Sequence, residues 1–233
     1  MKRLLPVLLK CISLLSAIPA LADQTIGLPA DPGQGNSTPF GGYSGRYQQV
    51  YAGSAFSGII VITSLQFFNT QSNSNATNVP SGNWTIALST TSANWNTLST
   101  NFAANVGADN AMVFSGNLSR PWAFGNTLTI NLSKPFAYNP QRGNLLMDVN
   151  VSGVTTSGPM IFFDTTGYNG GARNGSTVVG HVDSDGVFSG YGLVTRFVSG
   201  KPYGGGNIAL LTFLGLLAVW AALYTRRAKR AVS

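Results

Sequence analysis

Short runs of apolar and β-branched residues alternate along most of the chain with segments rich in Gly, Asn and Ser. In Asn83–Ser89 apolar and polar positions alternate one by one, so that Trp84, Ile86 and Leu88 would share one face. In Leu145–Val151 the same alternation would place Met147 and Asp148 on opposite faces. This period of two is typical of a strand with one buried side. The same pattern predicts about nine strands, at residues 46–52, 58–69, 83–90, 110–118, 127–133, 144–151, 160–166, 176–182 and 191–198.

This succession of strands, separated by Gly and Asn turns, predicts an all-β domain over residues 45–200. The expected architecture is an antiparallel β-sandwich of jelly-roll-like type. A parallel β-helix is not favoured, because the chain has no fixed short repeat. Residues 23–44 are predicted to be irregular, since Pro, Gly, Asn and Ser interrupt any period. Residues 90–111 are predicted to form a long surface loop or a short helical turn.

The first 22 residues have the pattern of a signal peptide. Lys2 and Arg3 precede an apolar run, and Ala20-Leu21-Ala22 is the small-x-small sequence that a signal peptidase accepts. We therefore expect cleavage after Ala22, with Asp23 as the mature N-terminus. An uncleaved membrane helix is the alternative.

The composition excludes several kinds of chemistry. Cys11 is the only cysteine and lies in the predicted signal peptide, so the mature chain would have no disulfide and no thiolate ligand. His181 is the only histidine, which excludes a His-rich metal site. No cofactor is predicted, and an exported domain without disulfides must be stabilised by its hydrophobic core.

A second apolar segment lies near the C-terminus. Residues 208–224 carry no charge and would form roughly 26 Å of helix, close to the lower limit for crossing a hydrocarbon core. They predict a transmembrane helix, with a Gly-rich spacer at 201–207 before it and a basic tail at 225–233 after it. A buried core helix with a basic tail is the alternative.

Positive charge follows the predicted helix at once. The positive-inside rule places these basic residues in the cytoplasm and the β domain outside it, in agreement with export by a signal peptide. The expected protein is single-pass and located in the cell envelope, with the lipid bilayer and signal peptidase as partners. The basic residues of this topology signal are Arg226, Arg227, Lys229 and Arg230.

The net charge of +7 resides entirely at the two ends of the chain. Seven of the 14 basic residues lie in the first ten or the last eight positions, and the other seven are balanced by seven acidic residues, all of them Asp. A neutral domain has no electrostatic footprint for a phosphate backbone, which excludes nucleic acid as a partner. The hydroxyl- and amide-rich middle of the chain is typical of an extracellular β protein.

The acidic residues are candidates for a paired carboxylate site, such as a glycosidase needs. The candidates by residue type are Asp148, Asp164, Asp183 and Asp185. The stretch 183–186 resembles the start of a calcium loop, but it lacks the later ligands, so a plain turn is favoured. A Ser-His-Asp triad would have to use His181, and no Gly-x-Ser-x-Gly elbow is present. We predict no catalytic residues and favour a non-enzymatic protein.

Aromatic residues beside polar ones suggest contact with sugar. Trp95 lies between Asn94 and Asn96, and Tyr168 lies in Gly-Tyr-Asn-Gly-Gly. Flat rings with neighbouring amides can stack on a sugar and bond its hydroxyls. Packing in the core or in loops is the alternative for each ring. Further aromatic candidates are Tyr43, Tyr47, Trp122 and Tyr138.

The C-terminal combination of spacer, apolar helix and Arg-rich tail resembles the bacterial PEP-CTERM class. The stretches FGGYSGRYQQVYAGSAFSG, SGNWTIALSTTSANWNTLS and DTTGYNGG are similar to the small β domains that often carry this tail. The resemblance implies sorting by an exosortase, and export to the surface or matrix of an exopolysaccharide-producing bacterium. It covers about the last thirty residues.

This tail departs from the class in one respect. The chain has no Glu, so the Pro-Glu-Pro triplet is absent. The sequence at its place resembles the GlyGly-CTERM signal, which implies a rhomboid-type protease instead. The candidate processing residues are Pro202, Gly204, Gly205 and Gly206.

Three hypotheses of function follow. The first is a structural or adhesive protein of the envelope or extracellular matrix, with extracellular polysaccharide as a possible partner. The second is a surface carbohydrate-binding module that uses Trp95 and loop tyrosines. The third is a polysaccharide-active enzyme that uses an Asp pair.

Overall fold

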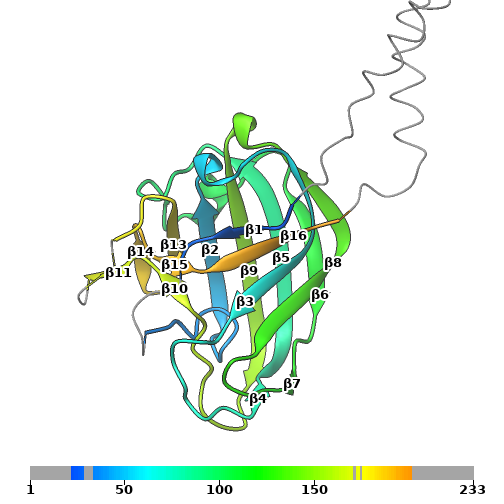
Figure 1. Cartoon of the computed structure of the whole chain (residues 1–233), viewed down its shortest axis with the longest axis vertical. Helices are drawn as coiled ribbons and strands as arrows, with labels where there is room; N and C mark the ends of the chain where they lie inside the picture. The colour runs from blue at the N-terminus through cyan, green and yellow to red at the C-terminus, as the bar shows by residue number, and fades with distance from the viewer. Residues whose placement is uncertain (1–21, 29–33, 170–171, 174, 201–233) are drawn as a thin grey trace, which may run out of the picture. The chain divides into compact units, whose positions relative to one another are not determined.

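The polar–apolar alternation of the sequence appears in the fold as a series of antiparallel strands. The computed structural model describes residues 22–28, 34–169, 172–173 and 175–200 (Figure 1). The chain divides into two units, residues 1–199 and 200–233. All described residues except Gly200 belong to the first unit.

The strands of the first unit are β1 (Gln24–Ile26), β2 (Gly45–Tyr51), β3 (Ile60–Phe68), β4 (Asn78–Val79), β5 (Ser81–Thr91), β6 (Ala111–Gly116), β7 (Arg120–Pro121), β8 (Thr127–Tyr138), β9 (Asn144–Thr155), β10 (Thr165–Thr166), β11 (Tyr168–Asn169), β12 (Ala172–Arg173), β13 (Val179–Asp183), β14 (Gly186–Phe188), β15 (Gly192–Leu193) and β16 (Thr195–Ser199). Three short 3₁₀ helices join some of them, namely η1 (Gly53–Ala55), η2 (Phe102–Asn105) and η3 (Pro140–Arg142). The described residues contain no α-helix, so the prediction of an all-β domain is confirmed.

Two sheets contain most of these strands. One has six strands in the order β14-β13-β2-β9-β5-β6, and the other has four in the order β1-β16-β3-β8. Their inner faces contribute to one hydrophobic cluster, in which Trp84 and Val149 from the first sheet meet Leu65 and Ile130 from the second. Figure 1 shows β3 and β16 lying in front of β2, β9 and β5. This arrangement is a β-sandwich.

The chain passes repeatedly between the two sheets. It alternates from β2 to β3 to β5, and again from β6 to β8 to β9. At one edge, β6 and β8 are joined by a hydrogen bond from Ser133 Oγ to the backbone oxygen of Val113, at 2.9 Å.

The predicted faces of the strands are confirmed where alternation was strict. Trp84, Ile86 and Leu88 on β5 are fully buried in the core, as predicted from their spacing. On β9, Met147 faces the core and its neighbour Asp148 lines the outer surface. The inward rows are apolar because they are buried between two sheets, whereas the outward rows can be polar.

The prediction missed several short strands, among them β14, and it assigned two segments wrongly. Residues 24–26, predicted to be irregular, form β1, which pairs with β16. Residues 160–166, predicted to be a strand, contain only the isolated bridges of Phe162 and Phe163 and the two-residue β10. The apolar side chains of Ile161 and Phe163 are nevertheless fully buried. Their burial therefore explains the apolar run without a strand.

The predicted signals at the chain ends lie mainly outside the described residues. These are Ala20 and most of the predicted signal peptide, the spacer from residue 201, the apolar segment 208–224 and the basic tail. Within the part of the chain that the structure describes, no helix has the length and hydropathy needed to cross a membrane.

Candidate functional site

The outer face of the six-stranded sheet carries a row of polar residues above the core. Strand register places Arg46 of β2 opposite Asn150 of β9, and Asn150 opposite Thr85 of β5. One row further along, Asp148 of β9 is paired with Ala87, and Ala87 with Met112 of β6.

These residues line a groove of about 390 Å³ on the sheet. β5 contributes Thr85 and Ala87, whose side chains are short, and β2 and β6 contribute the longer side chains of Arg46 and Met112. The lining residues are Arg46, Thr85, Ile86, Ala87, Met112, Asp148 and Asn150. A groove of this size falls within the range of small-ligand sites, about 300–1,000 Å³.

The groove contains a bidentate ion pair. Arg46 donates from Nε to Asp148 Oδ1 at 2.9 Å and from Nη2 to Oδ2 at 2.6 Å. The side chain of Asp148 is 10% exposed and that of Arg46 is 39% exposed. The hydrogen bond to Asp148 raises the pKa of Arg46, although burial acts in the opposite direction. The pair contributes one positive and one negative charge, so the groove has no net charge.

The loop between β5 and β6 covers the neighbouring part of the same face. Its residues Leu98 and Phe102 pack with Val50, Leu146 and Val182 of the sheet in a second hydrophobic cluster. The predicted loop over residues 90–111 therefore exists and includes the helical turn η2.

Polar contacts hold this loop on the sheet. Asn105 is 2% exposed, and its Nδ2 donates to Gln48 Oε1 at 2.8 Å. Gln48 in turn donates from Nε2 to the backbone oxygen of Phe102, at 3.1 Å. The Phe102 ring thus lies under the Arg46 guanidinium, 5.2 Å from the ring centre. The loop therefore helps to orient the arginine of the groove.

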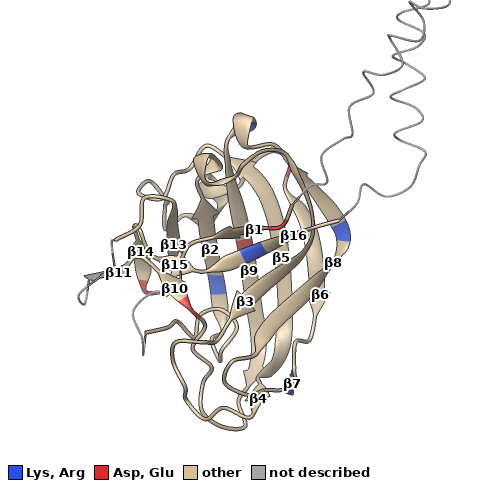
Figure 2. Ribbon diagram, in the orientation of Figure 1, with Lys and Arg blue, Asp and Glu red and all other residues tan. Residues whose placement is uncertain are grey.

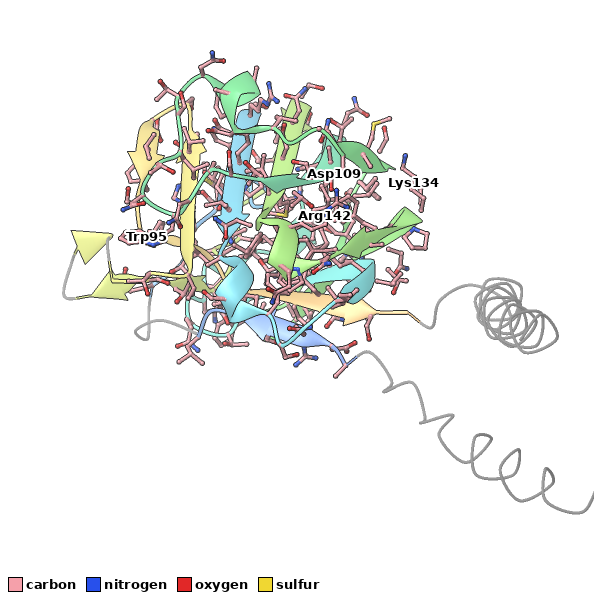
Figure 3. The ribbon with its side chains drawn as sticks, turned by 90° about the horizontal axis from the view of Figure 1, so that it is seen from above. Trp95, Asp109, Lys134 and Arg142 are labelled. Atoms are coloured by element: carbon pink, nitrogen blue, oxygen red, sulfur yellow. The ribbon has the colours of Figure 1, made fainter. Side chains whose placement is uncertain are left out.

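Trp95 lies in this loop but is not among the residues that line the groove (Figure 3). It is half-buried and packs against the second hydrophobic cluster. Its backbone is so close to β13 that a Cβ on Gly180 would lie 2.1 Å from Trp95 O. For Tyr168 the structure describes only the backbone pairing with Arg173. Trp95 is therefore not part of this groove.

Three of the other aromatic candidates are packing residues, as the interpretation of core or loop packing predicts. Tyr47 and Tyr138 are fully buried, and Trp122 is 7% exposed. All three belong to the core, where Tyr138 donates to Gly143 O and Trp122 donates to Asn69 Oδ1. Tyr43 is half-buried and donates from its hydroxyl to Ser184 Oγ at 2.8 Å.

The acidic candidates have separate structural roles. Asp164 is 1% exposed and accepts hydrogen bonds from Thr70 N, Gln71 N and Thr70 Oγ1. Asp183 accepts from Asp185 N in the turn between β13 and β14. The interpretation of residues 183–186 as a turn is therefore confirmed. Among the described residues, no group of three or more His, Cys, Asp or Glu side chains could hold a metal ion.

A second groove, of about 380 Å³, contains Asp109 and Arg142, together with Thr90 and Ala108. Figure 3 labels the two charged residues. Neither this groove nor the one at Asp148 is lined by a second Asp. The described geometry of these two grooves therefore does not provide the two carboxylates of a glycosidase.

His181 is a packing residue. It is fully buried between the rings of Tyr47 and Phe188, whose centres lie 5.0 Å and 4.9 Å from its own. Its Nδ1 lies 2.8 Å from Tyr191 O, so Nδ1 carries the proton of this bond. Its Nε2 lies 3.5 Å from Asp183 Oδ2. A fully buried ring cannot reach a substrate at the surface.

Comparisons with known proteins give no functional lead. No protein-family model matches the chain, and no curated protein is significantly similar to it.

Proposed function

We propose that this chain is an exported protein of the bacterial cell envelope or extracellular matrix, with a structural or adhesive role. The β-sandwich works outside the cytoplasm, and the C-terminal segment acts as a membrane anchor or sorting signal. We also propose a jelly-roll relation between the sheets, because the chain alternates between them.

One observation carries this proposal: the ordered domain begins and ends next to the predicted signals. β1 starts at Gln24, directly after the expected mature N-terminus Asp23, and β16 ends at Ser199, just before the spacer at 201–207. β1 and β16 are paired along three residues. The main cluster of the described core extends from Ile26 to Phe197, between the two predicted signals.

The surface of the domain supports the same proposal. Charged residues are scattered sparsely over the ribbon (Figure 2). A neutral surface of hydroxyls and amides favours neutral, hydrated partners over nucleic acid. The alternative of a surface carbohydrate-binding module is favoured by the groove at Arg46 and Asp148. The alternative of an Asp-pair enzyme lacks a second carboxylate in either groove that holds an Asp.

Fractionation of a producing bacterium, with mass spectrometry of both ends of the protein, tests the proposal. We expect the chain in the envelope or surface fraction, with Asp23 as its first residue. A C-terminus near Gly204–Gly206 would identify a removed sorting signal, and an intact Ser233 would identify an anchor. A cytoplasmic chain that keeps Met1 would overturn the proposal.

The signal peptide can be tested separately. Replacing Ala20 and Ala22 by Leu should block cleavage and cause the longer precursor to accumulate in the membrane, because signal peptidase needs small residues there. Ala17→Leu is the matched control, since Ala17 lies outside the small-x-small sequence. Equal processing of both variants would contradict the assigned cleavage site.

A further inference from the structure

We propose that the groove over β2, β5, β6 and β9 binds a segment of a neutral polysaccharide. The Arg46–Asp148 pair would bond its hydroxyls, and Met112 would contact its C–H face. This inference rests on the proposed function, an exported protein of the envelope or matrix, and it names a binding site and a class of ligand.

The charges of the groove select a neutral ligand. An anion site needs positive charge that is not already compensated, and here both oxygens of Asp148 accept hydrogen bonds from Arg46. A phosphate, sulfate or uronate would therefore gain no net electrostatic attraction from the pair. The pair still offers hydrogen bonds, because a guanidinium has five N–H groups and Asp148 uses two of them.

Neighbouring strands add the other groups that a sugar requires. Asn150 contributes an exposed amide, and Thr85 contributes a half-buried hydroxyl. Met112 is 56% exposed and stands beside the small side chain of Ala87. A flexible apolar side chain next to donors and acceptors matches the alternating C–H and O–H surfaces of a sugar ring.

The polar groups of the groove are held in place before any ligand binds. Arg46 is fixed on one side by Asp148 and on the other by the Phe102 ring, at 5.2 Å. The loop that carries Phe102 is anchored by the buried Asn105–Gln48 hydrogen bond. Preorganised groups lose little entropy on binding, which favours even a shallow site. Because the groove lies on the face of a sheet, a polymer can continue beyond it.

Binding of the full chain, purified in detergent, to a panel of polysaccharides tests this inference. The neutral probes are dextran, galactomannan and xylan, and alginate is the anionic counter-probe. Wild type should bind at least one neutral probe and bind alginate more weakly. Asp148→Asn should weaken neutral binding by about tenfold or more, because Arg46 loses its fixed partner. The same variant should strengthen alginate binding, because no carboxylate then compensates the positive charge of Arg46.

Two further variants and matched controls complete the test. Arg46→Lys should also weaken neutral binding by about tenfold, because Lys cannot form the bidentate pair. Met112→Ala should weaken it by a smaller factor. Asp109→Asn, in the second groove, and Met160→Ala, at a site 47% exposed, should leave binding unchanged. Thermal melting of each variant shows whether it is folded.

Several results would overturn the inference. One is wild-type protein that binds no neutral probe, and another is preferential binding of alginate. A third is a folded Asp148→Asn variant that binds neutral polysaccharide as well as wild type does. A fourth is an Asp109→Asn variant that loses as much binding as Asp148→Asn. A chain found in the envelope that binds no neutral probe would overturn only this inference. A cytoplasmic chain would overturn the proposed function.

Discussion

The carboxylate of Asp23 accepts a hydrogen bond from the backbone N–H of Ser199, with 2.9 Å between Oδ1 and N. This contact joins the residue before β1 to the last residue of β16. The two strands that begin and end the described domain are therefore neighbours in one sheet. Through this pairing, a three-residue strand next to the predicted cleavage site becomes part of the core.

Truncating Ile26 tests the importance of β1. Ile26 is 3% exposed in the main cluster, so Ile26→Ala should lower the free energy of unfolding by about 3 kcal/mol through lost burial and a residual cavity. Urea denaturation of wild type and variant measures the difference. Leu28→Ala, at a position 78% exposed, should change stability by less than about 0.5 kcal/mol. Equal effects of the two variants would show that β1 is not docked.

Asp164 should stabilise the segment after β3. Asp164→Ala leaves the backbone N–H groups of Thr70 and Gln71 without their acceptor. It should therefore lower the free energy of unfolding by about 3 kcal/mol. Asp164→Asn should cost about half as much, because the amide oxygen still accepts from both groups and its NH₂ can donate to Thr70 Oγ1. Urea denaturation compares the three proteins. An Asn variant as unstable as the Ala variant would contradict this role.

Gly180 permits the close approach of the β5–β6 loop to β13. A Cβ on residue 180 would lie 2.1 Å from Trp95 O, which is a steric overlap. Gly180→Ala should therefore displace the loop and lower the free energy of unfolding by about 2 kcal/mol. Chymotrypsin should then cleave faster at Trp95 or Phe102. Gly58→Ala is the control, because no atom lies within 4 Å of its added Cβ. Unchanged proteolysis of Gly180→Ala would contradict the contact.

Alkaline pH should destabilise the domain through its buried tyrosines. Burial raises the pKa of Tyr47 and Tyr51 above the ordinary value of 10.0. Above about pH 10 the unfolded chain loses these two protons while the folded domain keeps them. The free energy of unfolding should then fall by up to about 1.4 kcal/mol per pH unit for each tyrosine.

Urea titrations at several pH values, with phenolate absorbance as a second signal, measure this effect. Above pH 10, Tyr51→Phe should reduce the slope of the free energy of unfolding against pH by the contribution of one proton. The variant also removes the 2.8 Å contact between the hydroxyl and Thr195 Oγ1, but that loss does not depend on pH in this way. An unchanged slope would show that Tyr51 ionises in the folded domain.

The sequence was sufficient for the strands whose two faces differ. In β5 and β9 the alternation of apolar and polar residues predicted both the strand and its buried side, because that period depends only on local geometry. The apolar run at 160–166 was misleading, since burial of Ile161 and Phe163 needs no ladder of hydrogen bonds. β1 was missed because three residues without a pattern become a strand only beside β16.

The candidate site depended on tertiary structure. Alternation placed Asp148 on the outer face, but only the pairing of β2 with β9 brings it within 2.6 Å of Arg46, 102 positions earlier in the chain. Which strands pair depends on packing across the whole sandwich, and the alternation within one strand does not specify its partner. In the same way, only the fold shows that Tyr47 and Tyr138 pack in the core and do not contact the surface groove. The sequence by itself predicted the strands with strict alternation, such as β5, and the export signals at both ends, because both patterns are local. The fold decided which side chains meet.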